Sequence, residues 1–269
     1  MTVTWRHFPA GEAGFFRAPV LLTGPREALL IDGGFTLDDG RAVARAIEAT
    51  GKRLTTVYVS QSDPDYYFSL GPIRAAFPEA RIVAAPEAVA AIEATVQKKL
   101  DIWGPKLGAN GPQTRTDVVI PTPSDERTLA IDGEAIEIVD AQGLVNRRTL
   151  LVPSVQAVFG GVLVFAGVHV WTADSPTLEQ RAAWRANLDA LAERAPAVVV
   201  AGHAADGAAT DASAIAYTRA YLAAFDEELA RAAGSAALIA AMKARYPEAG
   251  MGVALDIGAK VATGEMKWG

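Results

Sequence analysis

The chain has 269 residues, of which 51% are hydrophobic and 21% are charged, an ordinary composition for a globular protein. Its net charge of −6 argues against nucleic acid or an anionic membrane as the main partner, because both bind basic surfaces. The absence of cysteine excludes disulfides and thiolate metal sites, and we expect a cytoplasmic protein because no secretory signal is visible at the N-terminus.

The first half begins with two units in which a strand runs into a turn. Residues 27–32 form a predicted strand that ends in an Asp-Gly-Gly turn, and a predicted helix follows over 40–50. Residues 54–60 are β-branched and aromatic and predict a second strand, which the Asp-Pro-Asp of residues 63–65 ends. The segment 60–71 therefore lies at a strand end, where functional sites are commonly built.

Strands and helices then alternate. Predicted helices over 71–77 and 86–103 flank a short buried strand over 81–85, which is typical of an α/β layered fold. Residues 104–123 are rich in Gly, Pro, Asn and Thr and predict a long loop between two halves. Residues 128–140 alternate around an Asp-Gly turn and predict a hairpin.

The second half contains an uncharged stretch and several helices. Leu150 to Trp171 carries no charge and is long enough for a membrane span, but its Pro and Gly residues favour two or three buried strands. Ser175-Pro176 is a predicted helix start, and a buried strand follows over 198–200. Further helices are predicted over 211–232 and 235–246. The amphipathic tail 252–268 is expected to pack on the domain or on a second copy of the chain, as in a homodimer.

The two strand-and-turn units resemble the N-terminal half of the metallo-β-lactamase fold. In that family the first unit ends in Asp-x-Gly, and the second carries His-x-His-x-Asp-His before an aromatic residue. The resemblance implies an α/β fold, a four-layer αββα sandwich of two mixed β-sheets flanked by helices. It implies a single domain over 1–269, with a core of about 15–230 and a C-terminal helical extension of about 233–269.

The resemblance also shows how far the family's metal site has been lost. The four ligand positions of its motif fall on Gln61, Asp63, Asp65 and Tyr66, and the remaining ones fall on Leu144, Val162 and His203. Zinc sites favour imidazole and thiolate ligands, and the whole chain contains three histidines. We therefore expect no zinc and no other cofactor, with Asp65 and His203 as the positions that the chain retains.

Two other interpretations of the loop stay open. Gln61, Asp63 and Asp65 form an oxygen-rich group that would suit a single hard cation such as Mg²⁺ or Mn²⁺, with His203 as a further ligand. Alternatively, Asp63 caps the next helix and stabilises the turn. For His203, the alternative to a site role is a partly buried histidine at a strand end whose hydrogen bonds are satisfied.

The retained residues predict chemistry on a small molecule without a metal. Asp65 could orient His203 as a general base, and Asp63 or Tyr66 could supply an acid, which gives hydrolysis or proton transfer. Gln61, Tyr67, His169 and Trp171 are the candidate substrate contacts, although a lone His or Trp in an apolar run is commonly a core residue. The alternative function is a non-catalytic protein that binds a small molecule in an aromatic-lined cleft.

Overall fold

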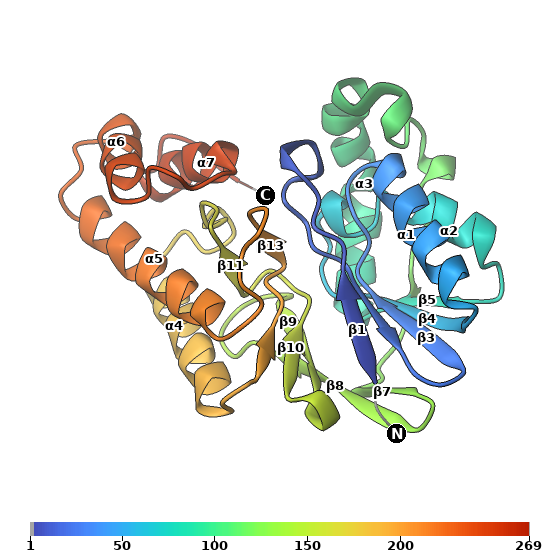
Figure 1. Cartoon of the computed structure of the whole chain (residues 1–269). Coiled ribbons are helices and arrows are strands. Elements are labelled where there is room, and N and C mark those ends of the chain that lie inside the picture. The colour runs from blue at the N-terminus through green and yellow to red at the C-terminus, as the bar shows by residue number, and fades with distance from the viewer. Residues whose placement is uncertain (1–2, 269) are drawn as a thin grey trace.

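Two mixed β-sheets pack face to face, with helices on their outer sides, in the computed structural model (Figure 1), which describes residues 3–268. The predicted αββα sandwich is thereby confirmed. Helices α1, α2 and α3 cover the first sheet, and helices α4 and α5 cover the second (Figure 1).

The first sheet has six strands in chain order, with the first two pairings antiparallel and the other three parallel. Its strands are β1 (Thr4–His7), β2 (Val20–Thr23), β3 (Glu27–Ile31), β4 (Arg53–Val59), β5 (Arg81–Ala84) and β6 (Thr122–Pro123). Strand β3 is buried on both faces, because alternate side chains meet the second sheet and the helices.

The second sheet has five strands in the order β12-β10-β9-β8-β7, and a separate parallel pair, β11 and β13, lies beside it. The strands are β7 (Thr128–Ile131), β8 (Glu134–Asp140), β9 (Arg148–Val152), β10 (Ala157–Phe159), β11 (Phe165–Ala166), β12 (Val198–Val199) and β13 (His203–Ala204). The predicted hairpin is β7–β8, and the uncharged stretch contains most of β9, all of β10 and β11. No helix among residues 3–268 is long and apolar enough to cross a membrane.

Seven α-helices complete the described chain. They are α1 (Leu37–Thr50), α2 (Leu70–Ala76), α3 (Pro86–Leu107), α4 (Leu178–Glu193), α5 (Ser213–Leu229), α6 (Ser235–Arg245) and α7 (Gly252–Ala262). Helix α4 begins at Leu178 rather than at the predicted Ser175-Pro176, because Thr177 and Gln180 form a capping box. A similar box between Thr36 and Asp39 starts α1 three residues before its predicted start.

The predicted loop over 104–123 is more ordered than its composition indicates. Helix α3 continues through Pro105 to Leu107, and short 3₁₀ turns follow at Gly108–Asn110 and Arg115–Asp117 before β6. The side chain of Gln113 donates to the carbonyl oxygens of Gly104, Gly108 and Gly111. These bonds satisfy carbonyl groups at the end of α3 and order the segment.

The C-terminal segment folds back onto its own chain. Val168 forms an isolated bridge with Gly250, and the N–H of His169 donates to the Gly250 carbonyl. Helix α7 approaches the chain closely at Gly258, where an added Cβ would lie 2.3 Å from the Thr172 hydroxyl. The extension is therefore packed against the domain through residues that follow β11.

Candidate functional site

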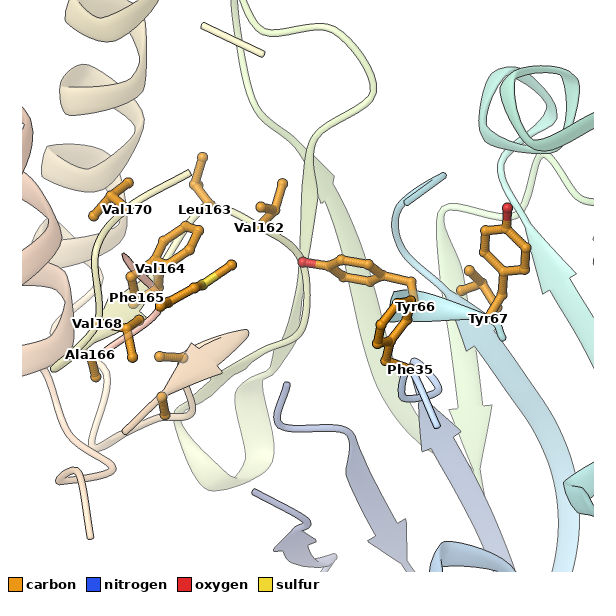
Figure 2. Close-up of a cluster of buried hydrophobic side chains, with 14 of the residues drawn as sticks. Phe35, Tyr66, Tyr67, Val162, Leu163, Val164, Phe165, Ala166, Val168 and Val170 are labelled. Carbon is orange, nitrogen blue, oxygen red and sulfur yellow. The ribbon is translucent and has the colours of Figure 1, made fainter. Parts of the chain in front are cut away.

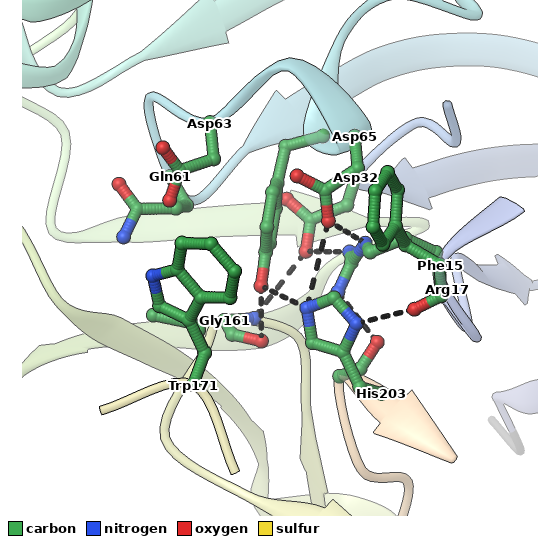
Figure 3. A network of polar contacts seen from close by, with 12 residues as sticks. Phe15, Arg17, Asp32, Gln61, Asp63, Asp65, Gly161, Trp171 and His203 are labelled. Carbon is green, nitrogen blue, oxygen red and sulfur yellow. Dashed lines mark hydrogen bonds and ion pairs between the residues drawn. The ribbon is translucent and has the colours of Figure 1, made fainter. Parts of the chain in front are cut away.

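The site lies at the ends of strands from both sheets, where four segments distant in sequence converge (Figure 3). Asp32 follows β3, the loop from Gln61 follows β4, Gly161 follows β10, and His203 begins β13. Clefts at the carboxyl ends of strands are common binding sites in sheets of this kind. A fifth segment, the N-terminal stretch that ends at Arg17, enters between them (Figure 3).

Asp32 ties the two sheets together beneath the site. Its carboxylate accepts hydrogen bonds from the Ser60 N–H at 2.7 Å and the Ser60 hydroxyl at 2.9 Å, and from the Gly161 N–H at 3.3 Å. Asp32 is fully buried and has a φ of 63°, a conformation that L-residues other than Gly, Asn and Asp rarely adopt. The turn that the sequence indicated at residues 32–34 therefore serves to aim this carboxylate.

Arg17 places a guanidinium among the acidic side chains. Its Nη2 donates to Asp32 Oδ2 at 3.2 Å, and its Nη1 donates to the Gly202 carbonyl at 2.5 Å. Its Nε lies 3.7 Å from Asp65 Oδ2, and its Cζ lies 3.6 Å from the centre of the Tyr66 ring. Burial alone lowers the Arg17 pKa, but the charges of these neighbours outweigh it and raise the pKa, so Arg17 stays positive.

Asp65 and His203 meet as the sequence predicted, at 3.5 Å between Asp65 Oδ2 and His203 Nε2. The imidazole is held by the Phe15 carbonyl, 2.7 Å from Nδ1. Because a carbonyl oxygen only accepts, Nδ1 carries the proton and Nε2 presents its lone pair to Asp65. Orientation of the ring thus comes from Phe15 as well as from Asp65.

Burial moves the pKa values of these two groups in opposite directions. It lowers the pKa of His203 to about 3, and the positive charge of Arg17 lowers it further. It raises the pKa of Asp65 to about 7, with a smaller rise from Asp63 and an opposing effect of Arg17. Near neutral pH, His203 is therefore neutral, and Asp65 exchanges a proton.

Tyr66 packs into the site as a neutral phenol. Its hydroxyl donates to the Gly161 carbonyl at 3.0 Å and lies 3.4 Å from His203 Nε2. Burial raises its pKa well above the ordinary value, so the hydroxyl stays protonated. Figure 2 shows its ring extending toward the segment that carries Val162, whereas Tyr67 points the other way.

Asp63 and Gln61 lie on the same loop but turn to other partners. Asp63 pairs with Lys99 of α3 at 3.2 Å, and its side chain makes no capping hydrogen bond to the 3₁₀ turn Pro64–Tyr66. The interpretation of Asp63 as a helix cap is therefore wrong. Gln61 accepts from Asn146 at 3.2 Å across the loop.

Of the other predicted substrate contacts, Tyr67 and His169 lie in separate buried clusters. Tyr67 is fully buried beside Phe68, and its hydroxyl has no hydrogen-bond partner. His169 Nδ1 lies 2.9 Å from the Tyr221 hydroxyl of α5. Trp171 is half-buried and donates to Asp174 at 3.0 Å, and Figure 3 shows it on the side of the network where Gln61 lies.

Sequence reasoning missed Arg17 and the structural use of Phe15 and Ser60. One signal was available for Arg17, because a single charge directly before the apolar run Ala18 to Leu22 indicates a buried and paired charge. The carbonyl of Phe15 leaves no such signal, since any residue carries one.

The fold and this site define a class: an αββα sandwich with a buried polar site where strands of both sheets end. A sequence model of the metallo-beta-lactamase superfamily matches residues 14–203, and the chain belongs to that superfamily.

Solved structures support the fold. The chain is similar to a metallo-beta-lactamase family protein from Thermus thermophilus, with 17% identity over 97% of this chain and 91% of that chain and a TM-score of 0.65. It is also similar to a metallo-beta-lactamase from Pontibacter korlensis, with 17% identity over 77% and 87% of the two chains and a TM-score of 0.53. No curated protein matches the sequence.

The residues present do not fit the metal that the family implies. Within residues 3–268, no group of three His, Asp or Glu side chains is placed to hold an ion. Asp63 already faces Lys99, and Asp65 faces Arg17, so a divalent cation would meet two fixed positive charges. The same geometry disfavours the single hard cation considered for Asp63, Asp65 and His203.

Proposed function

We propose that this protein carries out metal-independent acid–base chemistry on a small molecule, either hydrolysis or proton transfer, with Asp65 as the group that exchanges the proton. The observation that carries the proposal is the setting of Asp65. Its side chain keeps 13% of its surface exposed within an otherwise closed network, and its pKa of about 7 suits a base at neutral pH.

The roles within the pair differ from the simplest expectation, in which His203 is the base. A buried imidazole with a pKa of about 3 holds a proton too weakly for that role, so we assign the base to Asp65. Ionised Asp65 would take a proton from a water molecule or from a substrate carbon. Neutral His203 offers its Nε2 lone pair to the proton that Asp65 then carries.

The mouth of the site offers a small set of contacts for a substrate. Asp63 and Trp171 are partly exposed, and Gln61 lies beside them on the loop after β4. Tyr67 and His169 point into separate clusters, so the proposal gives them no contact with the substrate.

A hydrolase panel tests the proposal directly. The wild type, Asp65→Asn, His203→Ala and Asp63→Asn are assayed on esters, thioesters and lactones, with and without a chelator. We expect wild-type turnover that the chelator leaves intact, that Asp65→Asn abolishes and that Asp63→Asn largely retains. Full activity of Asp65→Asn would sink the assignment.

A second function, ligand binding without turnover, is favoured by the closure of the site. Arg17, Tyr66 and His203 are each at most 3% exposed. A hollow of about 400 Å³ lies elsewhere, lined by His7, Pro9, Val200 and residues 204–210. This function predicts a ligand that raises the melting temperature while mass spectrometry detects no product.

A further inference from the structure

The segment that delivers Arg17 is fixed against the strand that delivers His203. Arg17 forms an isolated antiparallel bridge with His203, and the Ala204 N–H donates to the Phe16 carbonyl at 2.8 Å. The Ala18 N–H donates to the Gly202 carbonyl at 3.1 Å. The guanidinium therefore reaches the site from a backbone whose position relative to the imidazole is set by hydrogen bonds.

This segment adopts a costly backbone conformation. Phe15 and Phe16 both have a φ of 55°, in the left-handed region that bulky residues rarely occupy. The two residues together aim the Phe15 carbonyl at His203 and the Arg17 side chain inward. Such strain persists only where the surrounding structure demands it, and it clusters at functional sites.

The guanidinium occupies a cradle made of two carboxylates and an aromatic face. Asp32 and Asp65 lie 3.2 Å and 3.7 Å from its nitrogens, and the Tyr66 ring covers its plane. The Nε nearest Asp65 is buried and has no hydrogen-bond partner, so a short movement of the carboxylate toward it would complete an ion-paired hydrogen bond. A planar fork fits this arrangement, whereas an ammonium would not reach all three groups.

We infer that Arg17 is a positioning residue for the proposed acid–base pair, and that its guanidinium is the fixed cation that holds the Asp65 carboxyl opposite Nε2 of His203. The catalytic meaning of this inference rests on the proposed function. Its physical core, a guanidinium-specific cradle formed by Asp32, Asp65 and Tyr66, can be tested without any turnover.

Chemical rescue of the full-length Arg17→Ala variant provides the test. Removing one partner of a buried ion pair is expected to lower the melting temperature by about 10 °C. Ethylguanidinium, at concentrations far below those that denature proteins, should restore several degrees, and ethylammonium at the same concentration should not. The wild type, whose cradle is filled, should respond to neither. No rescue, or equal rescue by both cations, would overturn the inference.

A second pair of variants covers the case in which Arg17→Ala does not fold. Arg17→Met keeps the length and the ring contact but removes the charge, and Arg17→Lys keeps the charge but removes the fork. Both should melt well below the wild type. If Arg17→Met melts with the wild type, the cation is unnecessary and the inference is wrong.

Turnover separates this inference from the proposed function. If ethylguanidinium rescues the fold but the wild type hydrolyses nothing in the substrate panel, the cradle stands and the acid–base function fails. If the wild type is active but neither cation discriminates, the function stands and the role of Arg17 fails.

Discussion

Two buried arginines in this molecule show how the same side chain can serve different ends. Arg181 lies between α4 and α5, where its Nε donates to Asp226 at 2.5 Å and its Nη1 donates to the carbonyls of Ser175 and Pro176. Arg17 lies between the sheets, leaves its Nε without a hydrogen-bond partner, and faces the partly exposed Asp65.

The difference concerns what lies next to each charge. The partner of Arg181 is shared with Arg185, a second arginine of α4, and the whole group joins two helices. The partners of Arg17 include Asp65, whose pKa is raised to about 7, and the site also holds His203, whose pKa is lowered to about 3. A buried ion pair that stabilises packing and one that tunes chemistry are therefore distinguished by their titrating neighbours.

The largest expected effect is on activity. Asp65→Asn removes the proposed base and should reduce kcat/KM by about 10²- to 10⁴-fold, as loss of a general base typically does. Asp63→Asn, on the same loop but paired with Lys99, is the matched control and should change kcat/KM far less. In the wild type, kcat/KM should rise with pH through about 7, because Asp65 acts in its ionised form. A fall over that range would show that Asp65 acts as an acid.

The comparison of the two arginines can be broken by a pair of equivalent substitutions. Arg17→Met and Arg181→Met should each destabilise the fold by about 3–5 kcal/mol, because each leaves a buried carboxylate without its partner. In NMR titrations, only Arg17→Met should raise the pKa of His203, since Arg17 lowers it in the wild type. An identical rise in both variants would mean that loosening of the fold, rather than the charge, is responsible.

The dependence of stability on pH gives a smaller effect with a defined sign. The folded pKa of Asp65 is raised above 3.8, so its contribution to stability is present at low pH and is lost as pH rises toward 7. The folded pKa of His203 is lowered below 6.5, so its contribution is lost as pH falls toward 3. The two oppose one another in the wild type. Asp65→Asn should therefore gain stability more steeply than the wild type between pH 4 and 6.5 in denaturant titrations; parallel curves would contradict the assigned shifts.

The smallest expected effect separates two neighbouring tyrosines. Tyr66→Phe removes the hydrogen bond to the Gly161 carbonyl and should cost about 1 kcal/mol in the free energy of unfolding. Tyr67→Phe removes a buried hydroxyl that has no hydrogen-bond partner and should be neutral or stabilising. Chemical denaturation measures both, and a larger loss for Tyr67→Phe would reverse this account of the loop.

The sequence by itself determined the layered fold and the positions that a metal site would need. Alternating strands and helices, the turn at Asp32 and the loop from Gln61 to Tyr66 are local patterns, and local patterns are readable in one chain. The same reasoning placed Asp65 and His203 together, because the resemblance puts both at strand ends. Helix starts were less accurate, since capping by Thr36 and Thr177 depends on local bonds that compete with other start signals.

Only the tertiary structure decided what fills the site. Arg17 and Asp65 are far apart in the chain, and nothing in either local pattern shows that a guanidinium will lie beside that carboxylate. The Phe15 carbonyl that fixes the His203 tautomer is likewise a backbone group that every residue carries. Burial then sets the pKa values of Asp65 and His203, and burial depends on the packing of both sheets around them.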